Sequence, residues 1–279
     1  MTAPLSTPTV SRARELERAL EEVRASRPAA VRVLQLADDP SADARKVAAA
    51  IELDPMMTAQ VLRLANSAAF GMRSRVSSTQ IAVSVLGFSA VRSIATLLAA
   101  GLRHNRHASP PGFWRHAAGT AAACSVVASR FGLARGDAFA IGLLHDLGVP
   151  ILHSVDPEVH QSIMDLGEDT GSQCGAEVAE FGMSHAEAAA RVLQNWSFPE
   201  SFVDAIANHH DSALGATREE QVLIAGDALA HLVLTPSGVL DETQERIDAI
   251  GMDDAALDSA VSVIADYANE VLSALPTGG

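Results

Sequence analysis

Apolar residues along this chain recur every three or four positions, and short polar stretches separate the segments that show this spacing. The period places apolar side chains on one face of a helix, whereas strict alternation would indicate a strand. No alternation longer than a few residues occurs. We therefore expect an all-α protein. Its predicted helices cover residues 8–26, 28–37, 41–53, 56–66, 77–87, 89–101, 113–131, 136–147, 156–168, 172–180, 184–196, 199–211, 217–234, 241–250 and 253–274.

Capping residues mark the starts of several of these helices. Asp54 is followed by Pro55, a residue favoured at the first helical position. Two stretches have the form of a capping box, Ser77 with Gln80 and Thr217 with Glu220, in which two side chains satisfy two backbone amides. Single serines are expected to cap two further helices, Ser41 and Ser89.

A polar stretch with two prolines interrupts the helical pattern at residues 104–112, which read HNRHASPPG. We interpret it as a linker between two helical parts. The prediction is an N-terminal helical subdomain over residues 1–103 and a C-terminal one over residues 113–279. The two should pack against each other, because the apolar faces of 56–65 and 81–98 are too large to remain exposed.

Composition narrows the classes of function. Of the 279 residues, 48% are hydrophobic, and the formal net charge is −14. An acidic surface repels nucleic-acid phosphates and anionic lipids, so we expect no nucleic-acid or membrane partner. The N-terminus lacks a signal-peptide pattern, and no apolar run of transmembrane length is seen, so we expect a cytoplasmic protein. Cys124 and Cys174 match no zinc or redox spacing.

Residues of metal-ligand type recur along the C-terminal part. His145 and Asp146 are adjacent at the end of a predicted helix, where Gly148 is expected to stop the helix. Such a pair can direct a ring nitrogen and a carboxylate at one point. Imidazole and carboxylate suit iron, manganese or zinc where open coordination positions are needed. The candidate metal ligands are His116, His145, Asp146, His185, His209, His210 and Asp227.

Each candidate also has a structural explanation. His116 on its alanine-rich helix can pack with its ring bonded to a carbonyl, and His185 follows a capping serine, Ser184. Asp227 has apolar neighbours, which argues against simple exposure. Taken together, the alternative to a metal site is a buried polar network that satisfies itself without metal. The other histidines fit no pattern: His104, His107, His153, His160 and His231.

The order of the candidate ligands resembles the HD superfamily of metal-dependent phosphohydrolases, including its HD-GYP branch. Motifs in the N-terminal part of the chain narrow the resemblance from the HD superfamily to its HDOD family. Residues 54–71 read DPMMTAQVLRLANSAAFG, and residues 77–95 read SSTQIAVSVLGFSAVRSIA, which look like consecutive helices of that family. Residues 113–121, 138–148 and 181–210 are similar to it as well. The resemblance covers roughly residues 25–235.

The HDOD resemblance implies an N-terminal helical bundle packed on a C-terminal HD-like helical bundle. It also implies a regulatory or output module of bacterial signalling, a class mostly without established catalytic activity. The HD resemblance implies two groups of metal ligands. The first is His116, His145, Asp146 and Asp227, and the second is completed by His185, His209 and His210.

Three departures from the HD-GYP pattern argue against hydrolysis of cyclic di-GMP. Val149 stands where the resemblance implies a lysine, and Gly112 stands where it implies a glutamate. No Gly-Tyr-Pro segment follows the His209-His210 pair.

A second candidate site lies in the N-terminal part. Arg63, Asn66 and Ser67 are about one helical turn apart and follow an apolar face, so they can form a ligand or partner surface. The favoured alternative is structural, since Asn66 and Ser67 can end the helix and Arg63 can be solvated or ion-paired.

These observations predict a stand-alone bacterial regulatory protein, because no receiver, GGDEF-like or kinase-like segment is visible. It would act by binding a signalling partner or a small phosphorylated ligand, with a retained HD-type site for a divalent metal, iron, manganese or zinc. One alternative is a metal-dependent phosphohydrolase or phosphodiesterase acting on a phosphorylated or nucleotide substrate. The other is a non-catalytic, metal-free helical scaffold. Whether the protein is an enzyme stays open, with the non-catalytic function favoured.

Overall fold

The protein is helical throughout the part that the structure describes. A computed structural model describes residues 10–22, 28–37, 39–67, 70, 76–100, 109–166, 170–210, 217–235 and 241–275. No strand occurs among these residues, so the all-α prediction is confirmed. Most of the expected linker, residues 104–108, lies outside the described part, and the division of the chain there stays a prediction.

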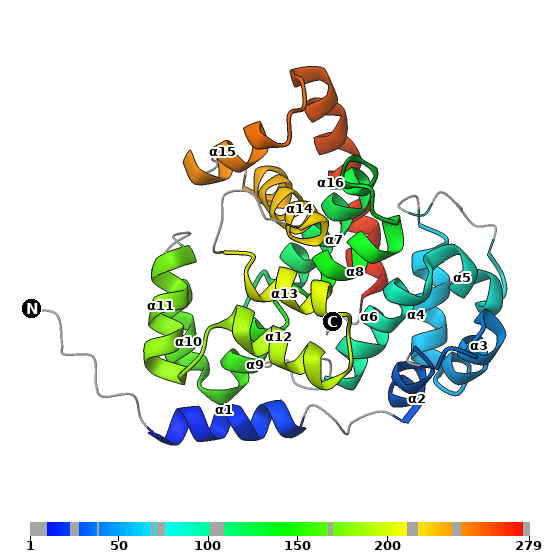
Figure 1. Cartoon of the computed structure of the whole chain (residues 1–279), viewed down its shortest axis with the longest axis horizontal. Coiled ribbons are helices and arrows are strands. Elements are labelled where there is room, and N and C mark those ends of the chain that lie inside the picture. The colour runs from blue at the N-terminus through cyan, green and yellow to red at the C-terminus, as the bar shows by residue number, and fades with distance from the viewer. Residues whose placement is uncertain are drawn as a thin grey trace, which may run out of the picture.

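The N-terminal bundle is formed by α2 to α6, with α1 lying apart from it against the other bundle (Figure 1). In this bundle α2 packs on α3 and α6, while α5 packs on α3 and α4. The helices are α1 Val10–Glu22, α2 Pro28–Ala37, α3 Ala44–Ile51, α4 Pro55–Ala65, α5 Thr79–Leu86 and α6 Phe88–Ala99.

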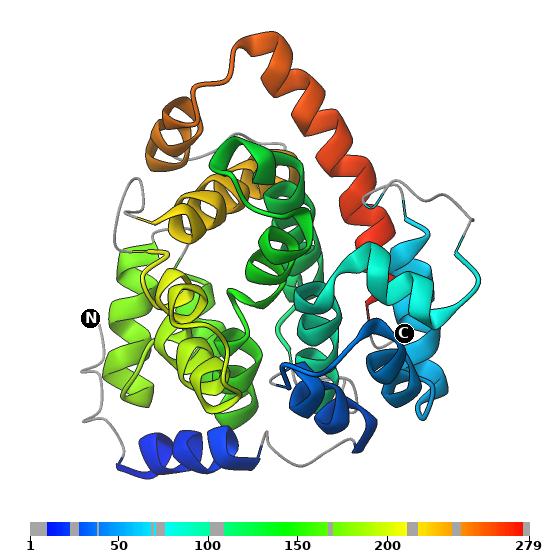
Figure 2. The same cartoon turned by 45° about the vertical axis from the view of Figure 1, so that its right-hand side comes forward.

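The C-terminal bundle is built around α7, which packs on α8, α14 and α16. Helix α16 runs along α7 and reaches α4, and α6 packs on α8, so the two bundles share a contact surface (Figure 2). The helices are α7 Phe113–Val127, α8 Arg135–Leu144, α9 Gly148–Val155, α10 Pro157–Met164, α11 Thr170–Phe181, α12 His185–Asn195, α13 Glu200–Ala207, α14 Arg218–Leu234, α15 Asp241–Ala249 and α16 Asp254–Ala274. A short 3₁₀ turn, Ala128–Phe131, follows α7.

Small residues let the central helices approach closely. The middle of α7 is a run of alanines and other small side chains that are almost completely buried. Gly226 of α14 faces this run, and a Cβ at that position would lie 2.3 Å from the Cys124 sulfur. Backbones that pack this tightly hold α7 and α14 at a fixed separation. This matters for function because both helices carry candidate ligands.

Three predicted caps are confirmed, among them Ser184 at α12, and three are wrong. The Asp54 carboxylate accepts from the Met56 amide, and Thr217 and Glu220 form the expected capping box at α14. In contrast, Asp43 caps α3 in place of Ser41, and Ser78 caps α5 in place of Ser77. Helix α6 begins after Gly87 with no side-chain cap, so Ser89 lies within its first turn. Of Ser77 and Ser78, only Ser78 has a hydroxyl that accepts from a backbone amide three residues further along, that of Ile81. An N-cap requires such a bond.

Replacement of the two serines tests the corrected cap of α5. Ser78→Ala should lower the free energy of unfolding by about 1 kcal/mol, because the Ile81 amide loses its partner at 3.2 Å. Ser77→Ala is the matched control and should change it by less than about 0.5 kcal/mol. Urea unfolding of both variants measures the difference, and a larger loss in Ser77→Ala would show that Ser77 is the cap, as the sequence predicted.

One stretch of the described residues is long and apolar enough to cross a membrane, Arg135–Val155, and 83% of its most apolar window is buried inside the protein. This stretch comprises α8, α9 and the turn between them, which form part of the core.

Candidate metal centre

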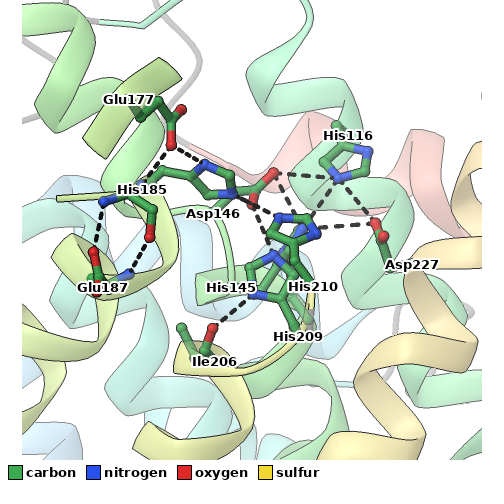
Figure 3. A network of polar contacts seen from close by, with 12 residues as sticks. His116, His145, Asp146, Glu177, His185, Glu187, Ile206, His209, His210 and Asp227 are labelled. Carbon is green, nitrogen blue, oxygen red and sulfur yellow. Dashed lines mark hydrogen bonds and ion pairs between the residues drawn. The ribbon is translucent and has the colours of Figure 1, made fainter. Parts of the chain in front are cut away.

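Three candidate ligands meet where α7, α8 and α14 cross. His116 lies on α7, His145 ends α8, and Asp227 lies on α14. The Nε2 atoms of the two histidines are 3.1 Å apart, and an Asp227 oxygen lies 3.2 Å from His116 Nε2 and 3.8 Å from His145 Nε2. We call these three residues the first group (Figure 3).

Three other histidines form a second group beside the first. His185 begins α12, and His209 and His210 lie in the turn after α13. The Nε2 atoms of His185 and His210 are 2.9 Å apart. The ligand atoms of these three residues and Asp146 all lie within 4.8 Å of one another.

Asp146 connects the two groups, because its two oxygens face opposite ways. Oδ2 lies 3.4 Å from His116 Nε2 and 3.2 Å from His145 Nε2. Oδ1 lies 3.5 Å from His185 Nε2 and 3.6 Å from His209 Nε2. The residue occupies the turn between α8 and α9. Gly148 does not stop a helix as predicted but begins α9, and the Asp146 carboxylate just before it lies between the two groups.

Backbone and side-chain acceptors orient the imidazoles. His145 Nδ1 donates to the Gly142 carbonyl at 2.9 Å, and His209 Nδ1 donates to the Ile206 carbonyl at 2.7 Å. Each bond leaves the Nε2 lone pair directed at the site. Orientation of this kind is typical of metal-binding histidines.

The residues present fit a divalent metal in each group. Donor atoms around a tetrahedral metal bound at about 2.1 Å lie about 3.4 Å apart, and most of the separations above are close to this value. His209 Nε2 is buried at the site without a hydrogen-bond partner among the described residues, since the nearest oxygen of Asp146 is 3.6 Å away. Such atoms are rare in a network that satisfies itself, so the arrangement favours metal binding over the metal-free alternative.

Two residues at the site were not found from the sequence. His231 lies one turn after Asp227 on α14, with its Nε2 3.7 Å from the Asp227 carboxylate. The i, i+4 spacing could have revealed it. Glu177 of α11 is 1% exposed and accepts from His185, but it lies eight residues away across a turn, and no spacing rule connects the two. Asp211, which follows His210 directly in the sequence and could have been expected to orient a histidine ring, lies outside the described residues.

The N-terminal candidates make contacts within the protein. Arg63 donates to the Ser273 carbonyl of α16, and Ser67 donates to the Leu64 carbonyl at 2.7 Å. Asn66 caps α4 and bonds both the amide and the carbonyl of Val76. None of the three lines the cavity at the histidine site. Their role as a ligand or partner surface stays a prediction.

Burial and neighbouring charges shift the pKa values of several residues at the site. Burial opposes protonation of His116, but its hydrogen bond to Asp227 and the charges of Asp227 and Asp146 outweigh burial and raise its pKa to about 9. Burial raises the pKa of the two carboxyls, but the neighbouring histidines outweigh it and hold both pKa values well below the usual range. For His209 and His210, burial is the largest influence and lowers the pKa, so these rings are neutral and can donate lone pairs to a metal.

Metal binding should therefore release protons. At pH 7 the metal-free protein holds His116 protonated, and a metal in the first group must displace that proton. We expect metal affinity to rise with pH from 7 to about 9, the raised pKa of His116. Because the pKa of His116 is higher in the folded chain than in the unfolded chain, the protonated ring also stabilises the metal-free fold. This stabilisation is fully present below about pH 6.5, the pKa of the unfolded chain, and it is lost as the pH rises through about 9.

Calorimetric titration with Zn²⁺ in two buffers of different ionisation enthalpy measures the released protons. About one proton or more per chain is expected at pH 7. His116→Ala should reduce the release, and a wild-type protein that binds Zn²⁺ without releasing protons would contradict the charge assignment.

A cavity of about 450 Å³ opens onto the site. His116, His145, Asp146, His185, His210 and Asp227 line its inner wall, together with His231. Arg115 is exposed and lines it from α7. Val149 and Met164 contribute apolar surface. A small anionic molecule can therefore reach the metal ligands from solvent.

Comparison with known proteins connects this geometry to a family. Residues 26–212 match the HDOD domain, close to the extent expected from the sequence, and the resemblance is confirmed. The chain is 26% identical over 203 residues to an uncharacterised protein of Treponema pallidum, covering 71% of this chain and 39% of that longer protein.

Solved structures share the fold. A candidate phosphohydrolase from Shewanella amazonensis is 22% identical, with a TM-score of 0.68 and coverage of 94% of this chain and 98% of that one. A candidate signal transduction protein from Marinobacter aquaeolei is 24% identical, with a TM-score of 0.65, covering 95% of this chain and 65% of that one. At these identities the likeness shows the helical HD-like fold, which agrees with the two-bundle arrangement described above.

Proposed function

The chain belongs to the HDOD domain family, and we propose that it is a regulatory module that binds a small phosphorylated ligand at a pair of divalent metals. One observation carries the proposal. The two oxygens of Asp146 face two separate histidine groups at 3.2–3.6 Å, as expected of a carboxylate shared by two metals.

Metals held there would bind phosphoryl oxygens and lower the pKa of bound water. The chain's own residues add recognition. Arg115 at the cavity wall can pair with a phosphate, and His231 offers a further nitrogen on the same wall. The size of the cavity suits a small phosphorylated molecule, and the −14 charge of the chain disfavours a long nucleic acid.

Val149 favours binding over hydrolysis. It is 6% exposed and lines the cavity three residues after Asp146, at the position where the HD-GYP resemblance implies a lysine. An aliphatic side chain there can neither donate a proton to a leaving group nor neutralise developing charge. The phosphohydrolase function remains the second proposal, favoured by the opening of the metal ligands to the cavity.

Phosphate binding tests this proposal. Protein loaded with Mn²⁺ should bind inorganic phosphate, and protein treated with chelator should not. Arg115→Ala should weaken binding several-fold, because a charge-assisted hydrogen bond is lost from a partly solvated site. Arg130→Ala, on the exposed turn after α7, is the matched control and should bind as the wild type does.

Equal phosphate binding with and without metal would contradict the proposal. Turnover of bis(p-nitrophenyl) phosphate by the loaded protein, abolished in Asp146→Asn, would select the phosphohydrolase function instead.

A further inference from the structure

We propose that Glu177 is the positioning residue of the second histidine group. In this role it holds the His185 ring with Nδ1 protonated and Nε2 facing the metal. The inference rests on the proposed metal site and adds to it a residue that determines how tightly the second group binds.

Glu177 makes two hydrogen bonds to His185. Its Oε2 accepts from the ring Nδ1 at 2.7 Å and from the backbone amide of the same residue at 2.8 Å. Two bonds to one residue fix both the start of α12 and the rotation of the ring (Figure 3). With Nδ1 engaged, only Nε2 remains for the site, and that atom lies 3.5 Å from Asp146 and 2.9 Å from His210.

Burial makes these contacts strong. Glu177 is 1% exposed and His185 is 5% exposed. A buried carboxylate without partners would be costly, so its pairing with His185 constrains the structure around it. Its other oxygen, Oε1, lies 3.6 Å from Nε2 of His160, which is fully buried. The carboxylate is thus held between two imidazoles from α10 and α12, and it cannot swing away from His185 without leaving both.

No such group serves His145 or His209, which use backbone carbonyls. A carboxylate accepts a stronger hydrogen bond than a carbonyl does, and it makes the ring more basic and a better metal ligand. His185 is therefore the imidazole of the second group whose orientation depends on a single replaceable side chain.

Glu177→Gln is the direct test, because the amide keeps the size of the side chain and removes its charge. The oxygen of a glutamine can still accept both hydrogen bonds, but it carries no negative charge and accepts them more weakly, and its NH₂ group takes the place of Oε1 beside His160. We expect Zn²⁺ affinity of the second group to fall by about 10–100-fold, while the first group binds as before. Glu187→Gln is the matched control. It removes a carboxylate from the first turn of the same helix, where Glu187 accepts from the Ser184 amide and does not contact the ring.

A second readout separates positioning from a purely structural role. In metal-free protein with ¹⁵N-labelled histidine, the His185 Nδ1 proton should give a downfield, slowly exchanging signal. The signal is expected in wild type and Glu187→Gln and should be lost or shifted upfield in Glu177→Gln. Because Nδ1 carries a proton in both the neutral and the charged ring, this result does not depend on the protonation state of His185.

The two measurements distinguish a failure of the proposed metal site from a failure of the proposed role of Glu177. If wild-type protein shows the protected Nδ1 proton but binds no Zn²⁺, the proposed metal site is wrong, while the positioning of the His185 ring by Glu177 is supported. If no protected Nδ1 proton is seen, or if Glu177→Gln binds Zn²⁺ as tightly as wild type, the inference is overturned. Equal loss of affinity in Glu187→Gln would also overturn it, because the effect would then come from the helix start.

Discussion

Asp146→Asn is expected to lose both metals at once. In wild-type protein each carboxylate oxygen faces its own histidine group, at 3.2 and 3.4 Å on one side and 3.5 and 3.6 Å on the other. The amide keeps one weak oxygen donor and turns an NH₂ group, which is not a ligand, toward the second group. We expect metal content to fall from about two ions per chain to a small fraction of one, measured by elemental analysis after dialysis against Mn²⁺ or Zn²⁺.

The helical content should survive this change, because Asp146 lies in the turn between α8 and α9 and is not part of the apolar core. Circular dichroism in chelator measures it. Asp137→Asn, on α8 just before this turn and outside the cavity at the site, is the control and should keep its metal. Loss of only one ion from Asp146→Asn would mean that the carboxylate serves one group and is not shared.

Gly148→Ala should have the largest effect on stability. A Cβ at this position would lie 1.9 Å from the His185 carbonyl oxygen and 2.7 Å from its carbonyl carbon. Both neighbours are backbone atoms, so α9 and α12 must separate to admit one methyl group. Overpacking of this kind costs about 3 kcal/mol or more of unfolding free energy. The same displacement moves His185, so the second group should also lose metal.

Gly175→Ala is the matched control for that experiment. Gly175 lies within α11, and a Cβ there would meet no atom within 4 Å. Since glycine destabilises a helix interior, this variant should gain about 0.5–1 kcal/mol. Urea unfolding in chelator measures both variants. A Gly148→Ala protein as stable as wild type would show that α9 and α12 are not in close contact.

Much of the fold could be predicted from the sequence, because helical periodicity is a local signal. The apolar spacing and the Asp54-Pro55 cap placed α4 correctly, and the capping box at Thr217 placed α14. Helix α9 was missed. Its eight residues contain Gly148 and Pro150, which read as helix-ending residues. In the structure the glycine is selected by the approach of α12, a tertiary contact that no local pattern reports.

The residues of the candidate site likewise divide into those that the sequence predicts and those that it does not. The seven ligands follow from residue types in order and from the HD resemblance, and the structure brings all seven together. Glu177 does not follow, because a glutamate on an amphipathic helix looks like a solvated residue until the fold buries it beside His185. His160 was set aside for a similar reason, and it is fully buried next to that carboxylate.

Anomalous diffraction from crystals of the full chain soaked in Mn²⁺ tests the central claim most directly. We expect two anomalous peaks, one among His116, His145 and Asp227 and the other among His185, His209 and His210, with the Asp146 carboxylate between them. The absence of any peak at these residues after loading, with the histidine rings bonded to one another instead, would contradict it.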